Sequence, residues 1–420
     1  MNFKKGFYGV LILLTLSKGS FSQTVFSLRQ SVQTARINNL YLRTAYFNIG
    51  IAETDIISAR LRPNLVLNNQ TLQLVNSKYF ATGSEQFNPI NRQVWWQVTK
   101  PIRLPQQRKY RVELAQQNVL LQQNSFMELQ RNLAFDVANQ WLETWVLKTK
   151  LELYLQAQSN IDSLVKISEL RLKNLVITQT DLIRTKLIAE QYNLQIRNVT
   201  QSYNNELKRL ILLIGNSDSI TIDNNDVAEP LSVESISLDS LINLALRLRT
   251  DVRAAKSVID ISESNIRLQK ALALPMPELG VIWNPQNTIP YLGFFGTVQL
   301  PLFSRNQGEI AKSQLVKQQA ESGLQALNQR ITTEVQTAYQ SYRTQRENLV
   351  KYETILAQSE AVLNSVRYAY LKGGTTIIDF LEAQRTWFDT RQIYYDAVIS
   401  YRKSYIQLLF STGLINQLYE

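Results

Sequence analysis

Two short stretches of the sequence combine threonine and aspartate at the same spacing, Thr-x-x-Asp. Thr178 and Asp181 form the first pair, and Thr376 and Asp379 form the second. This is the spacing of a capping box, in which the threonine oxygen accepts hydrogen bonds from first-turn amides and the acid favours the positive end of a helix. Carboxylates that are repeated around an opening instead attract cations. We predict helix starts at both pairs and keep both roles for the aspartates.

The chain of 420 residues contains no cysteine and no histidine. Disulfides, thiol chemistry, Cys/His zinc sites and imidazole-dependent triads are therefore excluded. No carboxylate pair stands out by its spacing, and no glycine-rich phosphate loop is present. The net charge of +11 includes no dense Lys/Arg block interleaved with aromatics, which argues against nucleic acid as a partner. We expect a protein that is not an enzyme and uses no cofactor and no bound metal.

The first 22 residues have the pattern of a secretory signal peptide. Lysines precede an apolar run over residues 6–16, and Ser20 and Ser22 occupy the small-residue positions before a cleavage site. The apolar run is too short for a comfortable membrane span, and an uncleaved anchor is the alternative interpretation. Without a cysteine after the cleavage position, a lipid anchor is excluded there. We predict an exported protein.

Residues 106–214 contain neither glycine nor proline. This run is far longer than an ordinary globular helix. Its weak point is Leu172–Thr178, where Asn174 can adopt a left-handed turn. We predict a helix over about residues 106–173, a tight turn and a second helix that ends near residue 214. At a rise of 1.5 Å per residue the first helix is about 100 Å long, so the pair forms a long antiparallel helical hairpin.

The second half of the sequence repeats this plan. We predict a helix over about residues 309–371, a turn at Lys372–Thr376 and a closing helix over about 377–411. A shift of 198 residues places Asp181 on Asp379, and it also aligns two seven-residue repeats of packing positions. The aligned repeats are Leu182, Ala189, Ile196, Tyr203 and Leu210 in the first half and Phe380, Trp387, Tyr394, Tyr401 and Leu408 in the second.

These repetitions predict an internally duplicated chain. The same shift aligns Gly215 with Gly413, so both halves end their helices at a glycine. We divide the chain into a signal peptide (1–22), a first repeat (23–215), a linker (216–240) and a second repeat (241–420). The linker has six acidic residues and no lysine or arginine, with a short strand expected at Ile220–Ile222.

Each repeat is expected to begin with one helix, which is followed by two strands. The predicted strands are Pro63–Val75, Val94–Ile102, Glu278–Trp283 and Tyr291–Leu302. The last of them alternates Phe294, Val298 and Leu300 with Phe295, Thr297 and Gln299, which is the weak pattern of a membrane β-strand. Three tryptophans suit an aromatic belt at a membrane interface: Trp95, Trp96 and Trp283. Soluble β-hairpins that pack on the helices are the alternative.

Four strands cannot close a barrel, and open strand edges are not tolerated in lipid. Several chains must therefore share one barrel if the strands lie in a membrane. Three chains supply twelve strands and a matching cylinder of long helices, with a pore on the symmetry axis. The fold class we expect is mainly α with a membrane β part, shaped as a duct. A periplasmic coiled-coil scaffold that does not insert in the membrane is the competing interpretation.

Three motifs resemble the TolC family of outer-membrane efflux channels, and the resemblance covers essentially all of the mature chain. They are "PLFSRNQGEIAKS" (Pro301–Ser313), "LRTDVRAAK" (Leu248–Lys256) and "YLKGGTTIIDFLEAQRTWFDTRQIYYDAVISY" (Tyr370–Tyr401). The first and third are nearer to the CzcC-like branch, which serves heavy-metal and other resistance-nodulation-division (RND) pumps. The resemblance implies a homotrimer with a twelve-stranded β-barrel in outer-membrane lipid and a periplasmic α-barrel tunnel. It also implies a periplasmic adaptor protein and an inner-membrane RND-type pump, with heavy-metal cations as one class of cargo.

The two turns between the long helices supply the candidate site residues. Candidates for contact with the adaptor are Lys173, Asn174, Leu175, Val176, Lys372, Gly373 and Gly374. For exposed Leu175 and Val176, packing against a neighbouring hairpin is the alternative. Candidates for the pore aperture are Thr178, Asp181, Thr376 and Asp379, for which helix capping is the alternative.

Overall fold

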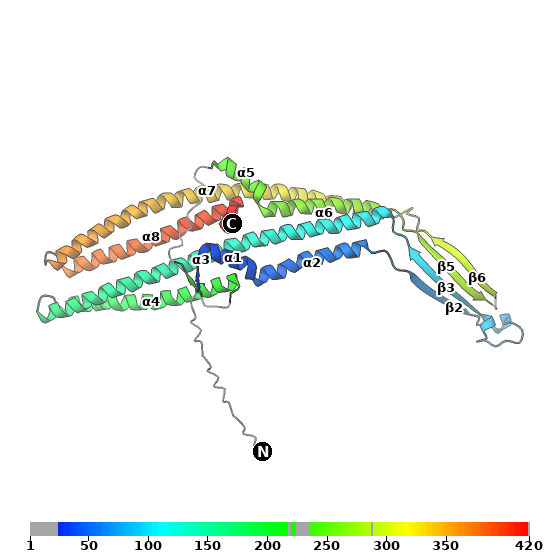
Figure 1. The fold of residues 1–420 in the computed structure, drawn as a ribbon, viewed down its shortest axis with the longest axis horizontal. Coiled ribbons are helices and arrows are strands. Elements are labelled where there is room, and N and C mark those ends of the chain that lie inside the picture. The colour runs from blue at the N-terminus through cyan, green and yellow to red at the C-terminus, as the bar shows by residue number, and fades with distance from the viewer. Residues whose placement is uncertain (1–23, 217–219, 224–235, 287–288, 419–420) are drawn as a thin grey trace, which may run out of the picture.

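The computed structural model describes residues 24–216, 220–223, 236–286 and 289–418. They form a long, bent body with helices along most of its length and a small sheet at one end (Figure 1). The expected signal peptide and most of the expected linker lie outside the described residues.

The described elements occur in the same order in both halves, apart from two 3₁₀ turns between the strands of the first half and one 3₁₀ turn after the last helix of the second. In the first half they are β1 (Thr24–Phe26), α1 (Leu28–Asn38), α2 (Leu40–Arg60), β2 (Val66–Gln73), η1 (Ser77–Tyr79), η2 (Pro89–Asn91), β3 (Arg92–Pro101), α3 (Pro105–Lys173) and α4 (Gln179–Ile214). In the second they are β4 (Ile220–Ile222), α5 (Leu238–Leu248), α6 (Thr250–Leu272), β5 (Glu278–Gln286), β6 (Ile289–Thr297), α7 (Gln307–Leu371), α8 (Ile377–Thr412) and η4 (Leu414–Leu418).

In each half two helices, not one, precede the long strands, so the prediction of a single helix was wrong. Asn39 separates α1 from α2, and its side-chain oxygen accepts hydrogen bonds from the amides of Tyr41 (2.9 Å) and Leu42 (3.1 Å). Arg249 stands at the equivalent break between α5 and α6, with the same extended backbone. Asparagine ends a helix here because its side chain satisfies the first amides of the next one.

The long helices follow the predicted bounds to within two residues. Helix α3 has 69 residues and α7 has 65, so each is roughly 100 Å long. The aligned seven-residue repeats are buried or half-buried on α4 and α8, in agreement with a packing role. Helix α5 begins at Leu238, inside the expected linker, and strand β4 lies where a short strand was predicted.

Both closing helices end at the predicted glycines. Gly215 has φ 72° and Gly413 has φ 77°, in the left-handed region that favours glycine. A Cβ atom at Gly215 would lie 2.5 Å from the carbonyl oxygen of Asn38. A side chain is therefore excluded there by both the backbone conformation and the close approach of α1.

The four long strands form one antiparallel sheet in the order β2-β3-β5-β6. Strand β6 ends at Thr297, so Val298 and Leu300 lie beyond the sheet and the predicted strand to Leu302 was too long. Strand β5 extends to Gln286, beyond the predicted end. Among the described residues, β2 and β6 each keep one edge without a partner strand.

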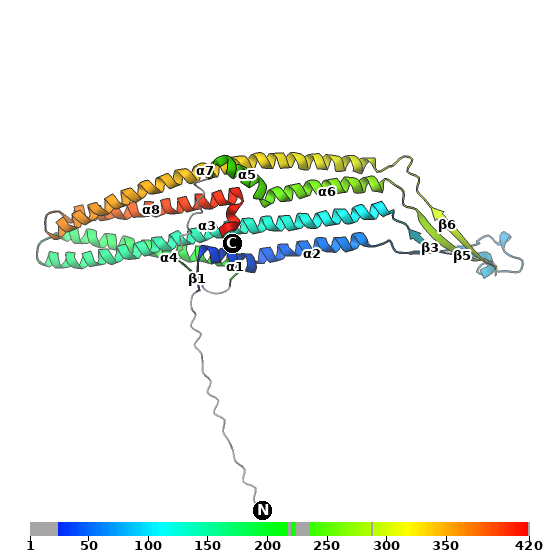
Figure 2. The ribbon, with the colours of Figure 1, turned by 45° about the horizontal axis from the view of Figure 1, so that its top comes forward.

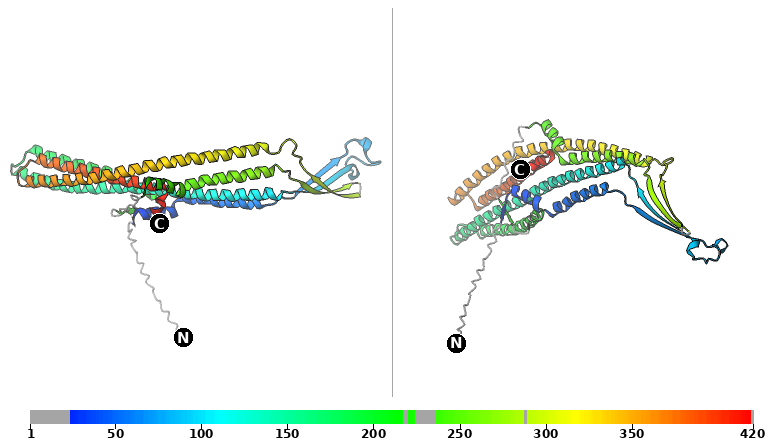
Figure 3. Two further views of the ribbon diagram at one scale, coloured as in Figure 1. Left: turned by 90° about the horizontal axis from the view of Figure 1, so that it is seen from above. Right: turned by 45° about the vertical axis from the view of Figure 1, so that its right-hand side comes forward.

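The helices follow the order of the strands. Next to the sheet, the neighbours are α2-α3-α6-α7, so the α2 and β2 edges lie on one side and the α7 and β6 edges on the other. Toward the other end, the α3–α4 hairpin lies beside the α7–α8 hairpin, as the rotated views also show (Figures 2 and 3). In the described part of the chain, no helix combines the length and the apolar character needed to cross a membrane.

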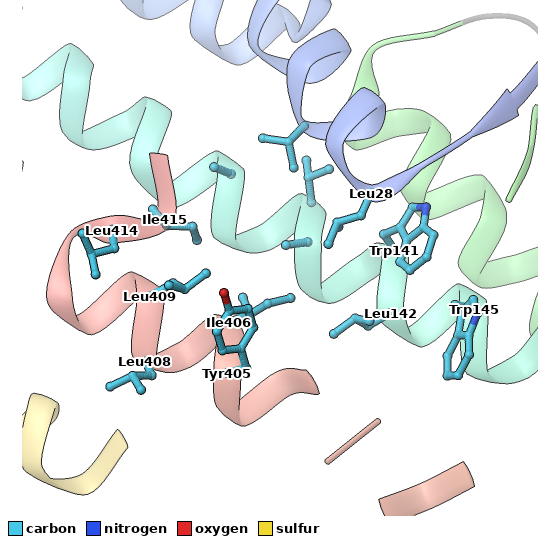
Figure 4. Close-up of a cluster of buried hydrophobic side chains, with 14 of the residues drawn as sticks. Leu28, Trp141, Leu142, Trp145, Tyr405, Ile406, Leu408, Leu409, Leu414 and Ile415 are labelled. Atoms are coloured by element: carbon cyan, nitrogen blue, oxygen red, sulfur yellow. The ribbon is translucent and has the colours of Figure 1, made fainter. Parts of the chain in front are cut away.

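The main hydrophobic core lies at mid-length, where the two halves meet (Figure 4). Leu142 of α3 points toward the end of α8, where Ile406 and Leu409 lie, whereas Trp141 lies beside Leu28 of α1. The indole nitrogen of Trp141 donates to the carbonyl oxygen of Phe26, 3.1 Å away, which ties β1 to this core. The parallel pairing of β1 with β4 links the first half to the second at the same level.

Candidate functional site

Both Thr-x-x-Asp pairs are capping boxes at the ends of the helical hairpins. The hydroxyl oxygen of Thr178 accepts from the amide of Asp181 (3.2 Å), and the carboxylate of Asp181 accepts from the amide of Thr178 (3.1 Å). Thr376 and Asp379 repeat these bonds at 3.2 and 3.1 Å. The capping interpretation is thereby confirmed for both pairs.

The same hydrogen bonds hold both aspartates in the ionised form. A side-chain hydrogen bond from Thr178, followed by its backbone amide, lowers the pKa of Asp181. Side-chain hydrogen bonds from Thr376 and then Thr375 lower the pKa of Asp379. Each hairpin end therefore carries a fixed negative charge beside the turn.

The two turns have the same backbone conformation but different residues at the left-handed position. Val176 N donates to Arg171 O at 2.9 Å, and Gly374 N donates to Ala369 O at 2.8 Å, so each hairpin reverses through the same six-residue closure. The left-handed position is Leu175 in the first turn (φ 59°) and Gly373 in the second (φ 78°). Asn174, expected to be left-handed, has φ −88° instead.

Apolar side chains protrude from the first turn. Leu175 is 90% exposed and Val176 is 66% exposed, and Lys173 and Asn174 beside them are also exposed. In the second turn Lys372, Gly373 and Gly374 are exposed. All seven predicted tip residues thus lie together at one end of the molecule, on two adjacent hairpins (Figure 1). Within the described chain, nothing buries Leu175.

Ion pairs and hydrogen bonds join the two hairpins, and the sequence did not predict them. Lys150 of α3 pairs with Asp396 of α8 at 2.7 Å, and Gln392 donates to the hydroxyl of Tyr154 at 3.0 Å. A third bond joins Arg391 to Gln156 at 3.3 Å. More than 230 residues separate the partners in each bond, so no local spacing could reveal them. They hold the α3–α4 hairpin against the α7–α8 hairpin.

At the opposite end, the sheet has one strongly apolar face. Directly paired residues point to the same side of a sheet. One row of directly paired residues across the strands consists of Val98, Val281 and Phe294. The next row on the same side contains Trp96, Trp283 and Leu292. The exposed apolar residues of this side, called the apolar sheet face, are Leu67, Trp96, Val98, Leu279, Val281, Trp283, Leu292 and Phe294; the polar residues Asn69, Thr71 and Lys100 lie on the same side.

The opposite face carries most of the sheet's amide and hydroxyl side chains. They are Asn68, Gln70, Gln93, Gln97, Thr99, Asn284 and Thr297. Trp95 points to this polar face, because it precedes Trp96 directly in β3. The three tryptophans therefore do not share one face: Trp96 pairs with Trp283, and Trp95 is separate. Alternation within β3 already implied that separation.

The described residues contain no group of three or more Asp or Glu side chains arranged to hold a metal ion, and the chain has no cysteine or histidine. The features that remain are two charged, partly apolar helical tips and one apolar sheet face at the other end.

Comparisons with known proteins agree with this architecture. A family model described as outer membrane efflux protein matches residues 241–414. The chain resembles the crystal structure of a membrane protein from Pseudomonas aeruginosa (TM-score 0.76, 18% identity, 93% of this chain and 91% of that chain). It also resembles CusC, described in terms of folding and transmembrane channel formation (TM-score 0.76, 17% identity, 98% and 99%), and the Campylobacter jejuni CmeC outer membrane channel (TM-score 0.73, 14% identity, 98% and 93%). No curated protein matches the sequence. The chain therefore has the fold of the outer-membrane efflux channels, with a helical tunnel part and a β part.

Proposed function

We propose that this protein is an outer-membrane exit duct that conducts substrates passively out of the cell. The observation that carries the proposal is the apolar sheet face, which is joined directly to helices of roughly 100 Å. A contiguous exposed apolar surface of this kind is rare on soluble proteins. Strands β3, β5 and β6 have 10, 9 and 9 residues, close to the length that crosses a bilayer when tilted.

A homotrimer completes the duct. Strands β2 and β6 are open edges, and open edges are not tolerated in lipid. In the proposed trimer, β2 of one copy pairs with β6 of the next, and three copies close a barrel of twelve strands. Helix α2 lies on the same edge as β2 and exposes Tyr41, Phe47 and Ile51, which suits burial against α7 of the neighbour. The polar sheet face then lines the barrel.

The helical tips are proposed to meet a periplasmic adaptor, which connects the duct to an inner-membrane pump of the RND type. Exposed Leu175 and Val176 are the docking side chains in this proposal, and Asp181 and Asp379 surround the aperture. Leu175→Asp should weaken chemical crosslinking to the adaptor while the trimer stays intact. Leu212→Asp, on an exposed position at the other end of α4, is the matched control. Undiminished crosslinking of the Leu175 variant would reject the docking role.

The resemblance of two motifs to the CzcC-like branch supports an assignment to heavy-metal efflux. Since the chain has no cysteine or histidine and only three methionines, cargo would pass without a relay of soft ligands along the duct. A deletion strain should then become more sensitive to divalent heavy-metal salts, and the intact gene should restore tolerance. Unchanged metal tolerance together with sensitivity to organic toxins would assign the duct to another pump. The four-part division into residues 1–22, 23–215, 216–240 and 241–420 is proposed from the signal-peptide pattern, the shift of 198 residues between the halves and the acidic composition of the linker.

The decisive experiment compares two adjacent residues of β3 that point to opposite faces. Val98 lies on the apolar sheet face and Gln97 on the polar one. A lysine on the lipid side near the bilayer midplane costs about 2–4 kcal/mol, whereas one on the lumen side costs little. Val98→Lys should therefore reduce the detergent-extracted trimer in the membrane fraction, and Gln97→Lys should not.

Native mass spectrometry of the mild-detergent extract measures this outcome. A wild-type trimer that requires detergent supports the duct. A monomer or dimer that osmotic shock releases would favour the alternative, a periplasmic coiled-coil scaffold.

A further inference from the structure

Basic side chains gather at the junction where the helices meet the sheet. They are Arg60, Lys100, Arg103, Arg108, Lys109 and Arg111. In the described part of the chain, none of these six takes part in an ion pair, whereas Arg131, Arg249 and Lys150 in the helical part all do. The junction therefore holds a group of positive charges that the described chain leaves without a carboxylate partner.

The junction arginines are held close to one another by bonds to uncharged groups. Arg103 donates to the carbonyl oxygen of Leu61 (3.3 Å), and Arg108 donates to that of Arg60 (3.1 Å). Burial, followed by the nearby charge of Arg103, lowers the pKa of Arg111. Like charges that are positioned together without neutralisation favour an anionic ligand from outside the chain.

A groove of about 640 Å³ gives this anion a place to bind. Its walls come from the end of α2 and the start of α3, with Arg60, Arg108 and Lys109 around it. Glu113 also lines the groove, and its charge is paired with that of Arg267 of α6. Guanidinium and ammonium groups at these positions suit a phosphate, which accepts several charge-assisted hydrogen bonds.

The apolar surroundings indicate which kind of phosphate. Lys100 lies on the apolar sheet face, two residues from Val98. At the opposite edge of the junction, just before α7, Leu302 is 66% exposed and Phe303 is 92% exposed, close in sequence to Arg305. Positive charge at the margin of an apolar surface matches a molecule with an anionic head and hydrocarbon chains.

We propose that the helix–sheet junction binds the phosphate of anionic phospholipids, with their acyl chains against the apolar sheet face. This inference rests on the proposed membrane function and adds the lipid class that the protein selects. Bound lipids would fix the depth of the barrel and neutralise the junction cations. A free phosphate ion shares the head-group chemistry but has no chains for the apolar surface.

The test uses the detergent-solubilised mature trimer and follows its melting temperature. It is titrated with didecanoyl phosphatidylglycerol, with didecanoyl phosphatidylcholine and with inorganic phosphate. The wild type should be stabilised by phosphatidylglycerol at lower concentration than by phosphatidylcholine. The triple variant Arg60→Gln, Arg108→Gln, Lys109→Gln should lose about a hundredfold in apparent affinity for phosphatidylglycerol, at roughly fivefold per cation.

A matched control removes three exposed cations elsewhere: Arg184→Gln, Arg197→Gln and Lys208→Gln on α4. This control variant should keep the wild-type preference for phosphatidylglycerol over phosphatidylcholine. Equal responses to both lipids overturn the inference, and so does full stabilisation by phosphate alone. A junction variant that keeps its lipid response but changes the ion selectivity of the pore would place these cations in the lumen and also overturn it. All these outcomes require an intact trimer in detergent, so a chain that is not a trimer contradicts the proposed function instead.

Discussion

The two hairpin tips have the same backbone conformation but different residues at the left-handed position. This difference distinguishes the residue that the fold favours from a residue that function requires. Gly373 adopts the left-handed conformation at no steric cost, whereas Leu175 adopts it at a cost of about 1–2 kcal/mol. The strained leucine is also 90% exposed. The fold alone favours glycine at both tips. Strain kept at an exposed position is typical of a functional contact, which is why Leu175 is our first candidate for docking.

The two helix breaks near the middle differ in a second way. Asn39 donates to the carbonyl oxygen of Leu213 (2.8 Å), and Arg249 donates to that of Ser411 (3.2 Å), the residue related to Leu213 by the shift of 198. Asn39 does so with a neutral amide. Arg249 is buried and charged, and it also bonds Asp251 (2.7 Å) and Glu334 (2.6 Å). The break between the two helices is thus stabilised by a neutral cap in the first half and by an ionic network in the second.

The largest expected effect follows from this second comparison. Arg249→Met removes the buried cation that Asp251 and Glu334 share, which leaves Asp251 with only the more distant Arg131 (3.8 Å), and it should destabilise the protein by about 3–5 kcal/mol. Asn39→Ala removes a neutral cap and should cost about 1–2 kcal/mol. Thermal melting of both variants beside the wild type, followed by tryptophan fluorescence in detergent, measures the difference. Equal losses would mean that the ionic network adds nothing beyond the cap.

The pH dependence of stability sharpens the same contrast. Burial alone would raise the pKa of Asp251, but hydrogen bonds and charge from Arg249, with the charge of Arg131, bring it below the ordinary 3.8. Because the folded pKa is lower than the unfolded one, this contribution is complete above about pH 4 and is lost as the pH falls through the folded value. The wild type should therefore lose melting temperature steeply below about pH 4.

The Asp251→Asn variant isolates that contribution. It should be less stable than the wild type at pH 7 and should show a shallower decline in acid. Asp379→Asn is the matched control, because that exposed carboxylate also has a lowered pKa but takes no part in the Arg249 network. Parallel pH profiles for wild type and Asp251→Asn would contradict the assignment of acid sensitivity to the network.

Local rules in the sequence were sufficient for the long helices, the capping boxes and the closing glycines. Each depends on residues within one turn of one another, as Thr376 and Asp379 illustrate. The sequence did not show that Leu175, rather than Asn174, takes the left-handed position, because the six-residue closure fixes that position regardless of residue preference. Nor did it show the pairing of Lys150 with Asp396, which depends on how two hairpins pack. The face of the sheet to which Trp95 points was predictable from the alternation of side chains in β3.

An exchange of tip residues tests the first comparison. Leu175→Gly relieves strain of about 1–2 kcal/mol but gives the unfolded chain more freedom, so it should stabilise the first tip by up to about 1 kcal/mol. Gly373→Leu should destabilise the second by about 1–2 kcal/mol. Hydrogen exchange of the turn amides, compared between residues 171–178 and 369–376, reports these local changes. Faster exchange at the first tip of Leu175→Gly would show that the leucine stabilises its own turn.

The smallest expected effect concerns the aspartates beside the tips. If Asp379 surrounds the aperture of a trimeric pore, three charges act together there, and its hydrogen bonds from Thr375 and Thr376 keep each one ionised. Asp379→Asn retains an oxygen that can cap α8 but removes the charge, so the open pore should become less selective for cations. Asp181→Asn makes the same change at the first tip, and the ratio of the two effects indicates which hairpin lies nearer the axis. Reversal potentials in a salt gradient across a planar bilayer measure both. If both variants keep the wild-type potential, the aspartates act as helix caps alone, and the negative charge at the tips has no part in conduction.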